Sequence, residues 1–284
     1  MNGIINVYKP CGITSHDVIY KVRRILGIKR IGHTGTLDPM ATGVLPICVG
    51  KATRASELIM ASEKEYKATV TFGFETTTQD STGEPTNKSD RRISKEEFID
   101  VLRKFKGDIT QIPPMYSAVH HNGKRLYKLA REGIEVERKP RNIKIFDITL
   151  LSFSQDEAQI LIKCSKGTYI RTLCEDIGRM GGICAHMSAL ERVRSGIFTV
   201  ENSVKVEDIS PEKLIPVDEM FTSYKKIQVS GENEKKVLNG APFEGECNLG
   251  EKYRIYSSDN TFLCLSEGIE ENGKKMFKMF KSFY

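Results

Sequence analysis

The chain has 284 residues, of which 39% are hydrophobic and 28% are charged, a balance typical of a folded protein with one large or two smaller domains. Its net charge of +6 is mild, and no apolar run approaches the ~20 residues that a transmembrane helix needs. Because the N-terminus lacks the layout of a secretory signal and the seven cysteines form no C-x-x-C pair, we expect a cytoplasmic protein with reduced thiols and no metal.

The N-terminal part predicts short strands and one capped helix. Residues 3–8 indicate a strand that ends at a Lys-Pro-Cys-Gly turn. Thr14 or Ser15 can cap a helix whose apolar residues recur at helical spacing, and Gly27 ends it. Further strands are predicted over 44–49 and 67–74.

The middle of the chain predicts a second group of elements. A long polar loop over 76–92 precedes a helix that Ser94 caps and that runs to about Lys106. After it we expect, in order, a strand pair over 141–153 and 158–165, a helix over 168–178 and a short helix over 186–193.

This order lacks the regular βαβ period of a doubly wound sheet. It favours an α+β fold with a mixed, mostly antiparallel sheet and flanking helices. Residues 209–221 are interpreted as a connector, and residues 223–284 as a small all-β appendage. The predicted domains are therefore 1–222 and 223–284.

Basic residues are concentrated in a few segments. Residues 21–30 carry five of them and no acid, and residues 121–144 carry eight against three glutamates. Four more lysines lie between 274 and 281. Such runs are most often solvated faces, but several of them with aromatic residues nearby favour a polyanionic partner.

The segment RIGHTGTLDPMATGVL, residues 30–45, concentrates glycine, threonine, one histidine and one aspartate. It lacks the Walker pattern of a phosphate loop. His33 and Asp38 have no third ligand close by for a metal. Pro39 restricts Asp38 to extended geometry, so the turn could hold one carboxylate in a defined place. From these residues alone, a catalytic Asp38 and a solvated turn aspartate remain equally open.

Several motifs resemble, in order, those of the bacterial tRNA pseudouridine-55 synthases, the TruB family. They cover most of residues 1–200, and a weaker one, VLNGAP, lies at 237–242. The strongest are GIINVYKPCGITSHD at 3–17, GHTGTLDPMATGVLPICVGKATR at 32–54, KEY at 64–66, TQDSTG at 78–83, QIPPMYSAVHHNGKRLYKLAREG at 111–133 and CSKGTYIRTLCEDIG at 164–178.

The resemblance implies an isomerase that flips one T-loop uridine of tRNA out of the stack, breaks its N1–C1′ bond and joins C5 to C1′. It implies no cofactor, no metal, no membrane and no obligate protein partner, and we expect a monomer that binds the T-stem-loop. It also implies an RNA-clasping insertion at about 120–145, with salt-sensitive binding, and a C-terminal β-barrel of the PUA type.

By motif position, Asp38 matches the essential aspartate of the family and Arg171 the arginine that pairs with it. Tyr66 matches the tyrosine that stacks on the flipped uracil, and Tyr169 another pocket residue. Each match is a hypothesis that the resemblance supplies.

Four more residues acquire roles in the same way. His33 resembles the residue that fills the space left in the RNA, and Leu190 an apolar pocket residue. Lys9 and Pro10 resemble the pair that supports the active-site loop. The chain departs from the family at His120, where a lysine is usual, and at Glu191 and Val193.

Two other functions stay open at this point. One is an RNA-binding chaperone of tRNA folding, whose catalysis is secondary or absent. The other is a guide-RNA-dependent pseudouridine synthase subunit, which the short C-terminal part disfavours.

Overall fold

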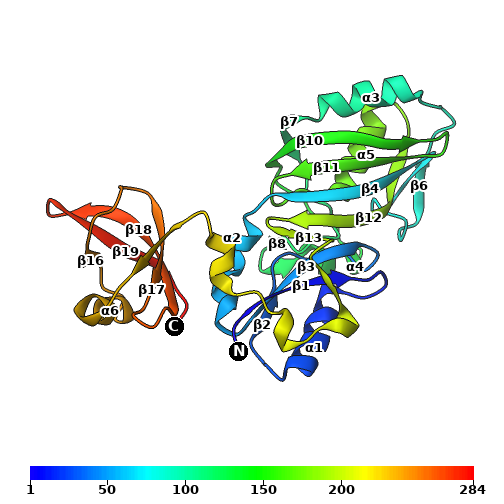
Figure 1. The fold of residues 1–284 in the computed structure, drawn as a ribbon. Helices are drawn as coiled ribbons and strands as arrows, with labels where there is room; N and C mark the ends of the chain where they lie inside the picture. Colours follow the sequence, from blue (N-terminus) through cyan, green and yellow to red (C-terminus); the bar gives the residue numbers. More distant parts are fainter.

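The computed structural model describes residues 1–284 and contains two large β-sheets and two two-stranded hairpins (Figure 1). The larger sheet forms the main body, with the strand order β14-β1-β3-β12-β4-β11-β10-β7. Short strands β2 and β13 pair with β3 and β12. The strands are β1 (Gly3–Lys9), β2 (Ile31–His33), β3 (Thr42–Val49), β4 (Lys64–Phe72), β7 (Gly107–Gln111), β10 (Arg141–Phe153), β11 (Glu157–Cys164), β12 (Ala185–Ser195), β13 (Phe198–Thr199) and β14 (Val204–Lys205).

Most pairs in this sheet are antiparallel, and only β1–β14 and β3–β12 are parallel. The expectation of a mixed, mostly antiparallel α+β fold is therefore confirmed. Helices α1 (Ser15–Leu26), α3 (Lys95–Lys104) and α5 (Ile170–Met180) flank the sheet, and their apolar faces join a cluster of 36 buried residues. None of the helices has the length and apolar character needed to span a bilayer.

Local sequence signals place two of these helices. Thr14 and Asp17 form the capping box of α1, and Gly27 ends it with a φ of 66° in the left-handed region. Ser94 and Glu97 form the equivalent box of α3. The predicted helices over 14–27 and 94–106 are therefore confirmed, as is the strand pair at 141–153 and 158–165.

Three predictions of local structure are wrong. Residues 186–193 belong to β12, the central strand between β3 and β4, and not to a helix. Two bulges in β12 break its period-two alternation, so Met187, Leu190 and Val193 recur at a helix-like spacing of three. The polar stretch 76–92 contains part of a hairpin, β5 (Phe74–Thr76) with β6 (Pro85–Lys88); every residue of β6 is exposed, so no apolar pattern marks it.

The third correction concerns the C-terminal part, which is not all β. It holds helix α6 (Gly231–Leu238) and a curled five-stranded sheet, a half-barrel and not a closed barrel. Its order is β15-β17-β18-β19-β16, with β15 (Lys225–Gln228), β16 (Phe243–Glu244), β17 (Lys252–Tyr256), β18 (Phe262–Glu271) and β19 (Lys274–Ser282). Leu265 and Phe283 of this part pack in one apolar cluster with Ile4 and Phe198 of the main body. The domain boundary at 222/223 stays a prediction.

The remaining elements are short. A two-stranded hairpin and a small helix occupy the insertion that the sequence analysis placed at 120–145. These elements are β8 (His120–His121), β9 (Lys124–Arg125) and α4 (Leu126–Arg131), with α2 (Ser56–Met60) and 3₁₀ turns at Gly50–Ala55, Val206–Asp208, Pro211–Lys213 and Val217–Phe221 elsewhere.

Candidate active site

Asp38 and Arg171 meet although they are far apart in the chain. Asp38 lies in the turn between β2 and β3, and Arg171 in the first turn of α5. Arg171 Nε is 3.0 Å from Asp38 Oδ2, with the arginine side chain 7% exposed and the aspartate side chain 35% exposed. One carboxylate is thus held against a buried guanidinium while it stays open to a ligand.

The other nitrogens of Arg171 are also occupied by the protein. Nη1 donates to the carbonyl oxygen of Thr78 at 3.2 Å, and Nη2 donates to that of Tyr116 at 2.8 Å. These two carbonyls belong to separate loops. The planar fork of the guanidinium therefore ties both loops to the Asp38 turn.

Asp80 lies behind this pair and was missed by the sequence analysis. Its Oδ2 is 3.5 Å from Arg171 Nη1, and its side chain is 5% exposed. Its Oδ1 accepts hydrogen bonds from the hydroxyls of Thr78 and Thr82 and from the Thr82 amide. TQDSTG was noted as a motif, but only the fold shows that its aspartate reaches α5.

The electrostatic state of Asp38 reflects opposing influences. Burial raises the pKa of its carboxyl, and Asp80 adds to this effect. Arg171 and Lys9 lower the pKa, but the net shift is upward from the ordinary value. Any loss of Arg171 would therefore favour protonation of Asp38.

Lys9 supports the turn that carries Asp38 through hydrogen bonds to backbone carbonyl groups. Its side chain is fully buried, and Nζ donates to the carbonyl oxygens of Pro10 at 2.9 Å, Ile13 at 2.7 Å and Pro39 at 3.1 Å. Burial lowers the pKa of Lys9 to about 8. Lys9 thus fixes the backbone of the residue that follows Asp38, and Pro10 contributes its carbonyl group.

Tyr66 and Leu190 project from neighbouring strands to one face of the sheet. Tyr66 of β4 is opposite Arg192 of β12, and Leu190 precedes Arg192 by two residues. Burial raises the pKa of Tyr66, to which Arg192 and Asp38 also contribute with opposite signs. The Tyr66 hydroxyl therefore lies close enough to Asp38 for the charge of that carboxylate to affect its pKa.

His33 ends β2, five residues before Asp38, and is partly buried. Its Nδ1 accepts a hydrogen bond of 3.3 Å from the Gly35 amide. Burial and the nearby Arg192 lower its pKa. Both influences favour the neutral form of the imidazole over the charged form.

Tyr169 is the N-cap residue of α5 and is held by Gln111, which the sequence analysis did not single out. The Tyr169 amide donates to Gln111 Oε1 at 2.8 Å, and Gln111 Nε2 donates back to the Tyr169 carbonyl at 3.0 Å. Gln111 thereby fixes the start of the helix that carries Arg171.

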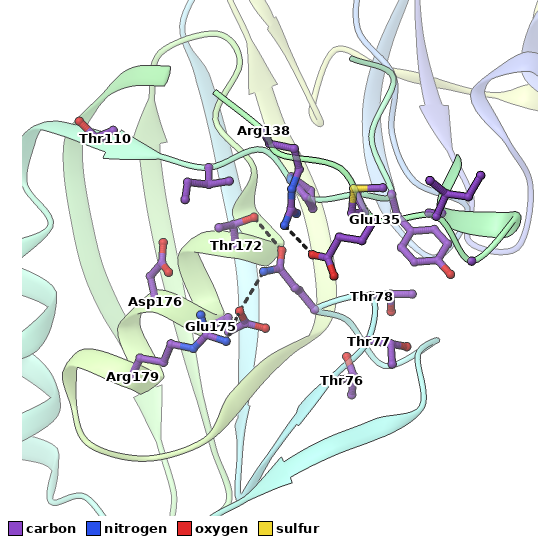
Figure 2. A pocket seen from close by; sticks show the side chains of 18 residues that line it. Thr76, Thr77, Thr78, Thr110, Glu135, Arg138, Thr172, Glu175, Asp176 and Arg179 are labelled. Atoms are coloured by element: carbon purple, nitrogen blue, oxygen red, sulfur yellow. Dashed lines mark hydrogen bonds and ion pairs between the residues drawn. The ribbon is translucent and has the colours of Figure 1, made fainter. Parts of the chain in front are cut away.

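A cavity of about 660 Å³ lies next to the groups that accept hydrogen bonds from Arg171, and neither Asp38 nor Arg171 lines it. Figure 2 shows the side chains of its wall. Thr78 and Tyr116, whose carbonyls accept from Arg171, form part of its wall. Along α5, Thr172 donates to Gln79, Gln79 donates to Glu175, and Glu175 pairs with Arg179. The network in this wall stabilises the loop that carries Asp80.

The residues singled out from the sequence thus gather from separate parts of the chain. Arg171 contacts Asp38, and Lys9 bonds to the adjacent Pro39. Tyr66 and His33 both lie within the electrostatic influence of Arg192. No group of three His, Cys, Asp or Glu side chains is placed to hold a metal ion. The roles of the individual residues stay predictions.

Comparison with known proteins agrees with the motifs. Residues 23–170 match the family model described as TruB family pseudouridylate synthase (N terminal domain). Residues 171–222 match the tRNA pseudouridylate synthase B C-terminal domain.

Curated relatives cover nearly the whole chain. The tRNA pseudouridine synthase B of Clostridium novyi (strain NT) is 46% identical over 93% of this chain and 95% of its own. That of Staphylococcus haemolyticus (strain JCSC1435) is 48% identical over 85% of each chain.

A chain in the crystal structure of a Cbf5–Nop10–Gar1 complex has the same fold. It superposes with a TM-score of 0.75 at 26% identity, over 99% of this chain and 85% of its own. Together with the family models, these similarities show that the chain belongs to the TruB family of pseudouridylate synthases.

Proposed function

We propose that this protein converts uridine-55 in the T-loop of tRNA to pseudouridine. The observation that carries the proposal is the contact between Asp38 and Arg171, because it provides an aspartate that is ionisable, oriented and partly shielded from water. The names of the relatives, tRNA pseudouridine synthase B, point to the same substrate class.

The substrate base must leave the RNA stack before it reaches Asp38. Flipping costs a few kcal/mol, and stacking on the Tyr66 ring at ~1–3 kcal/mol per base offsets this cost. Leu190 lies on the same face and gives the flipped base an apolar neighbour. His33, at the end of β2, would fill the space that the base leaves in the RNA.

Asp38 then acts as a carboxylate. Whether it attacks the ring, attacks C1′ or removes a sugar proton, the ionised form is the reactive one. Arg171 and Lys9 favour this form against burial. The bond from N1 to C1′ breaks, the base turns, and C5 bonds to C1′. C5 then loses its proton and N1 gains one, so the product is an isomer of uridine and no redox partner is needed.

The insertion that contains β8, β9 and α4 is a second element of the proposal. His120, His121, Lys124 and Arg125 face each other across the β8–β9 hairpin. This concentration of basic groups beside the site suits the phosphates of the T-stem. We further propose that the protein acts in the cytoplasm as a monomer, without an obligate protein partner.

A full-length tRNA transcript tests the function. The purified protein is incubated with the transcript alone, and pseudouridine is located by digestion and mass spectrometry. We expect a single pseudouridine, at position 55. Modification that requires an added guide RNA would support the guide-dependent alternative. Refolding of misfolded tRNA without any modification would support the chaperone alternative.

A further inference from the structure

Arg192 is a buried cation without an anionic partner. It has the greatest volume of the fully buried side chains and is 2% exposed. Asp38 and Asp80 pair with Arg171, and none of the ion pairs in the chain includes Arg192. Because removal of an unpaired charge from water costs free energy, a buried arginine without an anionic partner indicates a functional role.

The position of Arg192 places it at the site. It is opposite Tyr66 on one neighbouring strand, β4, and opposite Gly43 on the other, β3. A Cβ atom at Gly43 would lie 2.3 Å from the Arg192 carbonyl oxygen, so glycine is required for this close approach. Tyr66, Arg192 and Gly43 therefore form one row across three strands, next to the Asp38 turn.

Its guanidinium is only partly occupied by the protein. Nε donates to the carbonyl oxygen of Val44 at 2.7 Å, and Nη2 donates to that of Gly35 at 3.1 Å. Nη1 has no carbonyl acceptor, and the one further side chain that hydrogen-bonds to the Arg192 side chain is Tyr66, the proposed stacking residue. A guanidinium has five N–H donors, so Arg192 keeps donors for a ligand at the edge where Nη1 lies.

In the other buried cations, a larger share of the N–H donors is hydrogen-bonded to protein groups. Arg171 bonds to Asp38 and to two backbone carbonyls, and Lys9 donates to three carbonyls. Lys64 donates to the carbonyls of Met60 and Ser62. The charge of Arg192 also reaches the ligand-facing groups, since it lowers the pKa of His33.

We propose that Arg192 is a catalytic residue that stabilises the uracil anion formed when the N1–C1′ bond breaks. This inference rests on the proposed function. The electron pair of the broken bond stays on the ring, and its charge spreads to the O2 and O4 oxygens. The N–H groups of Arg192 donate to one of these oxygens. When C5 has bonded to C1′, the C5 proton is lost and N1 gains a proton.

Two variants of Arg192 distinguish a role of its charge in the reaction from a role in holding the Asp38 loop in place. Arg192→Gln retains hydrogen-bonding groups without the charge, whereas Arg192→Lys retains the charge without the fork. Arg194→Gln is the matched control, because Arg194 is on the same strand but is 39% exposed and pairs with Glu65. Thermal unfolding and tRNA affinity are measured for each variant.

Single-turnover consumption of the target nucleoside is the main readout. Removal of one preorganised hydrogen-bond donor to a developing oxyanion typically slows a reaction about 100- to 1,000-fold. We expect this loss for Arg192→Gln, a smaller loss for Arg192→Lys, and no change for Arg194→Gln, with tRNA affinity similar in all three variants.

A transcript with 5-fluorouridine at the target position provides the decisive comparison. Its C5 carries fluorine and no proton, so the reaction stops once C5 has bonded to C1′, and it is followed as consumption of 5-fluorouridine. Fluorine withdraws electrons and makes the departing anion intrinsically more stable, so the deficit of both Arg192 variants should shrink on this substrate. If Arg192→Gln does not fold, Arg192→Lys supplies the same comparison. Equal losses in the two variants, unchanged by fluorine, would overturn the proposal and leave Arg192 as a brace of the loop. Failure of the wild type to consume uridine would instead refute the proposed function.

Discussion

Arg171→Lys is the substitution that most directly perturbs the site. The guanidinium contacts Asp38 at 3.0 Å and the carbonyls of Thr78 and Tyr116 at 3.2 and 2.8 Å. A lysine places all its donors on one atom and cannot reach all three groups as the planar fork does. Loss of one hydrogen bond to a charged group costs ~1.5–3 kcal/mol, which corresponds to a decrease in rate of about 10- to 150-fold.

The same substitution should change the pH dependence. Burial raises the pKa of Asp38 and Arg171 lowers it, so a displaced cation lets the pKa rise further. Because the ionised carboxylate is the reactive form, activity increases as pH rises through this pKa. The acid limb of the pH–rate profile should therefore move to higher pH in the variant.

Initial rates are measured as release of label from uracil C5 of a T-stem-loop transcript over a series of pH values. Arg103→Lys is the control, because Arg103 lies on α3, outside the site, is 75% exposed and pairs with Asp100. We expect near wild-type behaviour from this control. Near-normal turnover by Arg171→Lys, with an unshifted acid limb, would refute the reasoning.

Three further predictions address neighbouring residues. Tyr66→Leu removes the proposed stacking surface and should weaken T-stem-loop binding by ~1–3 kcal/mol, whereas Tyr66→Phe keeps the ring and should bind as the wild type does. The affinities are measured by titration, and an affinity of Tyr66→Leu equal to that of Tyr66→Phe would contradict this. Asp80→Asn removes the charge 3.5 Å from Arg171 Nη1 and should lower kcat without changing tRNA affinity; an unchanged kcat would rule out a positioning role. Folding lowers the pKa of Lys9 from 10.5 to about 8, so the folded chain binds this proton more weakly than the unfolded chain does. Between these two pH values, rising pH should therefore increase the unfolding free energy of the wild type by up to about 3 kcal/mol relative to Lys9→Met. Parallel curves of unfolding free energy against pH for the two proteins would be inconsistent with this.

Local signals in the sequence predict a helix or strand correctly where they agree with the tertiary packing. The capping boxes at Thr14 and Ser94 predict α1 and α3 because they satisfy backbone groups within a few residues. The buried run of β3 is recognisable because nearly every one of its residues is apolar.

Other features depend on contacts that the sequence does not express. The helix expected at 186–193 is wrong because two bulges change the apolar spacing of a central strand. Asp80, Gln111 and Arg192 acquire importance only through partners far away in the chain. The resemblance supplied Asp38 and Arg171 as a pair, whereas the residues alone left Asp38 open between a solvated turn and a catalytic carboxylate.

Asp38→Asn provides the most direct measurement of the central claim, that the carboxylate held by Arg171 performs the isomerisation. Asparagine retains the size of the side chain and its position beside Arg171 but cannot ionise. Label release from uracil C5 is measured at saturating T-stem-loop, after binding has been shown to match that of the wild type. The account predicts release by the wild type and none above background by Asp38→Asn. Release by the variant at a rate similar to the wild type would contradict it.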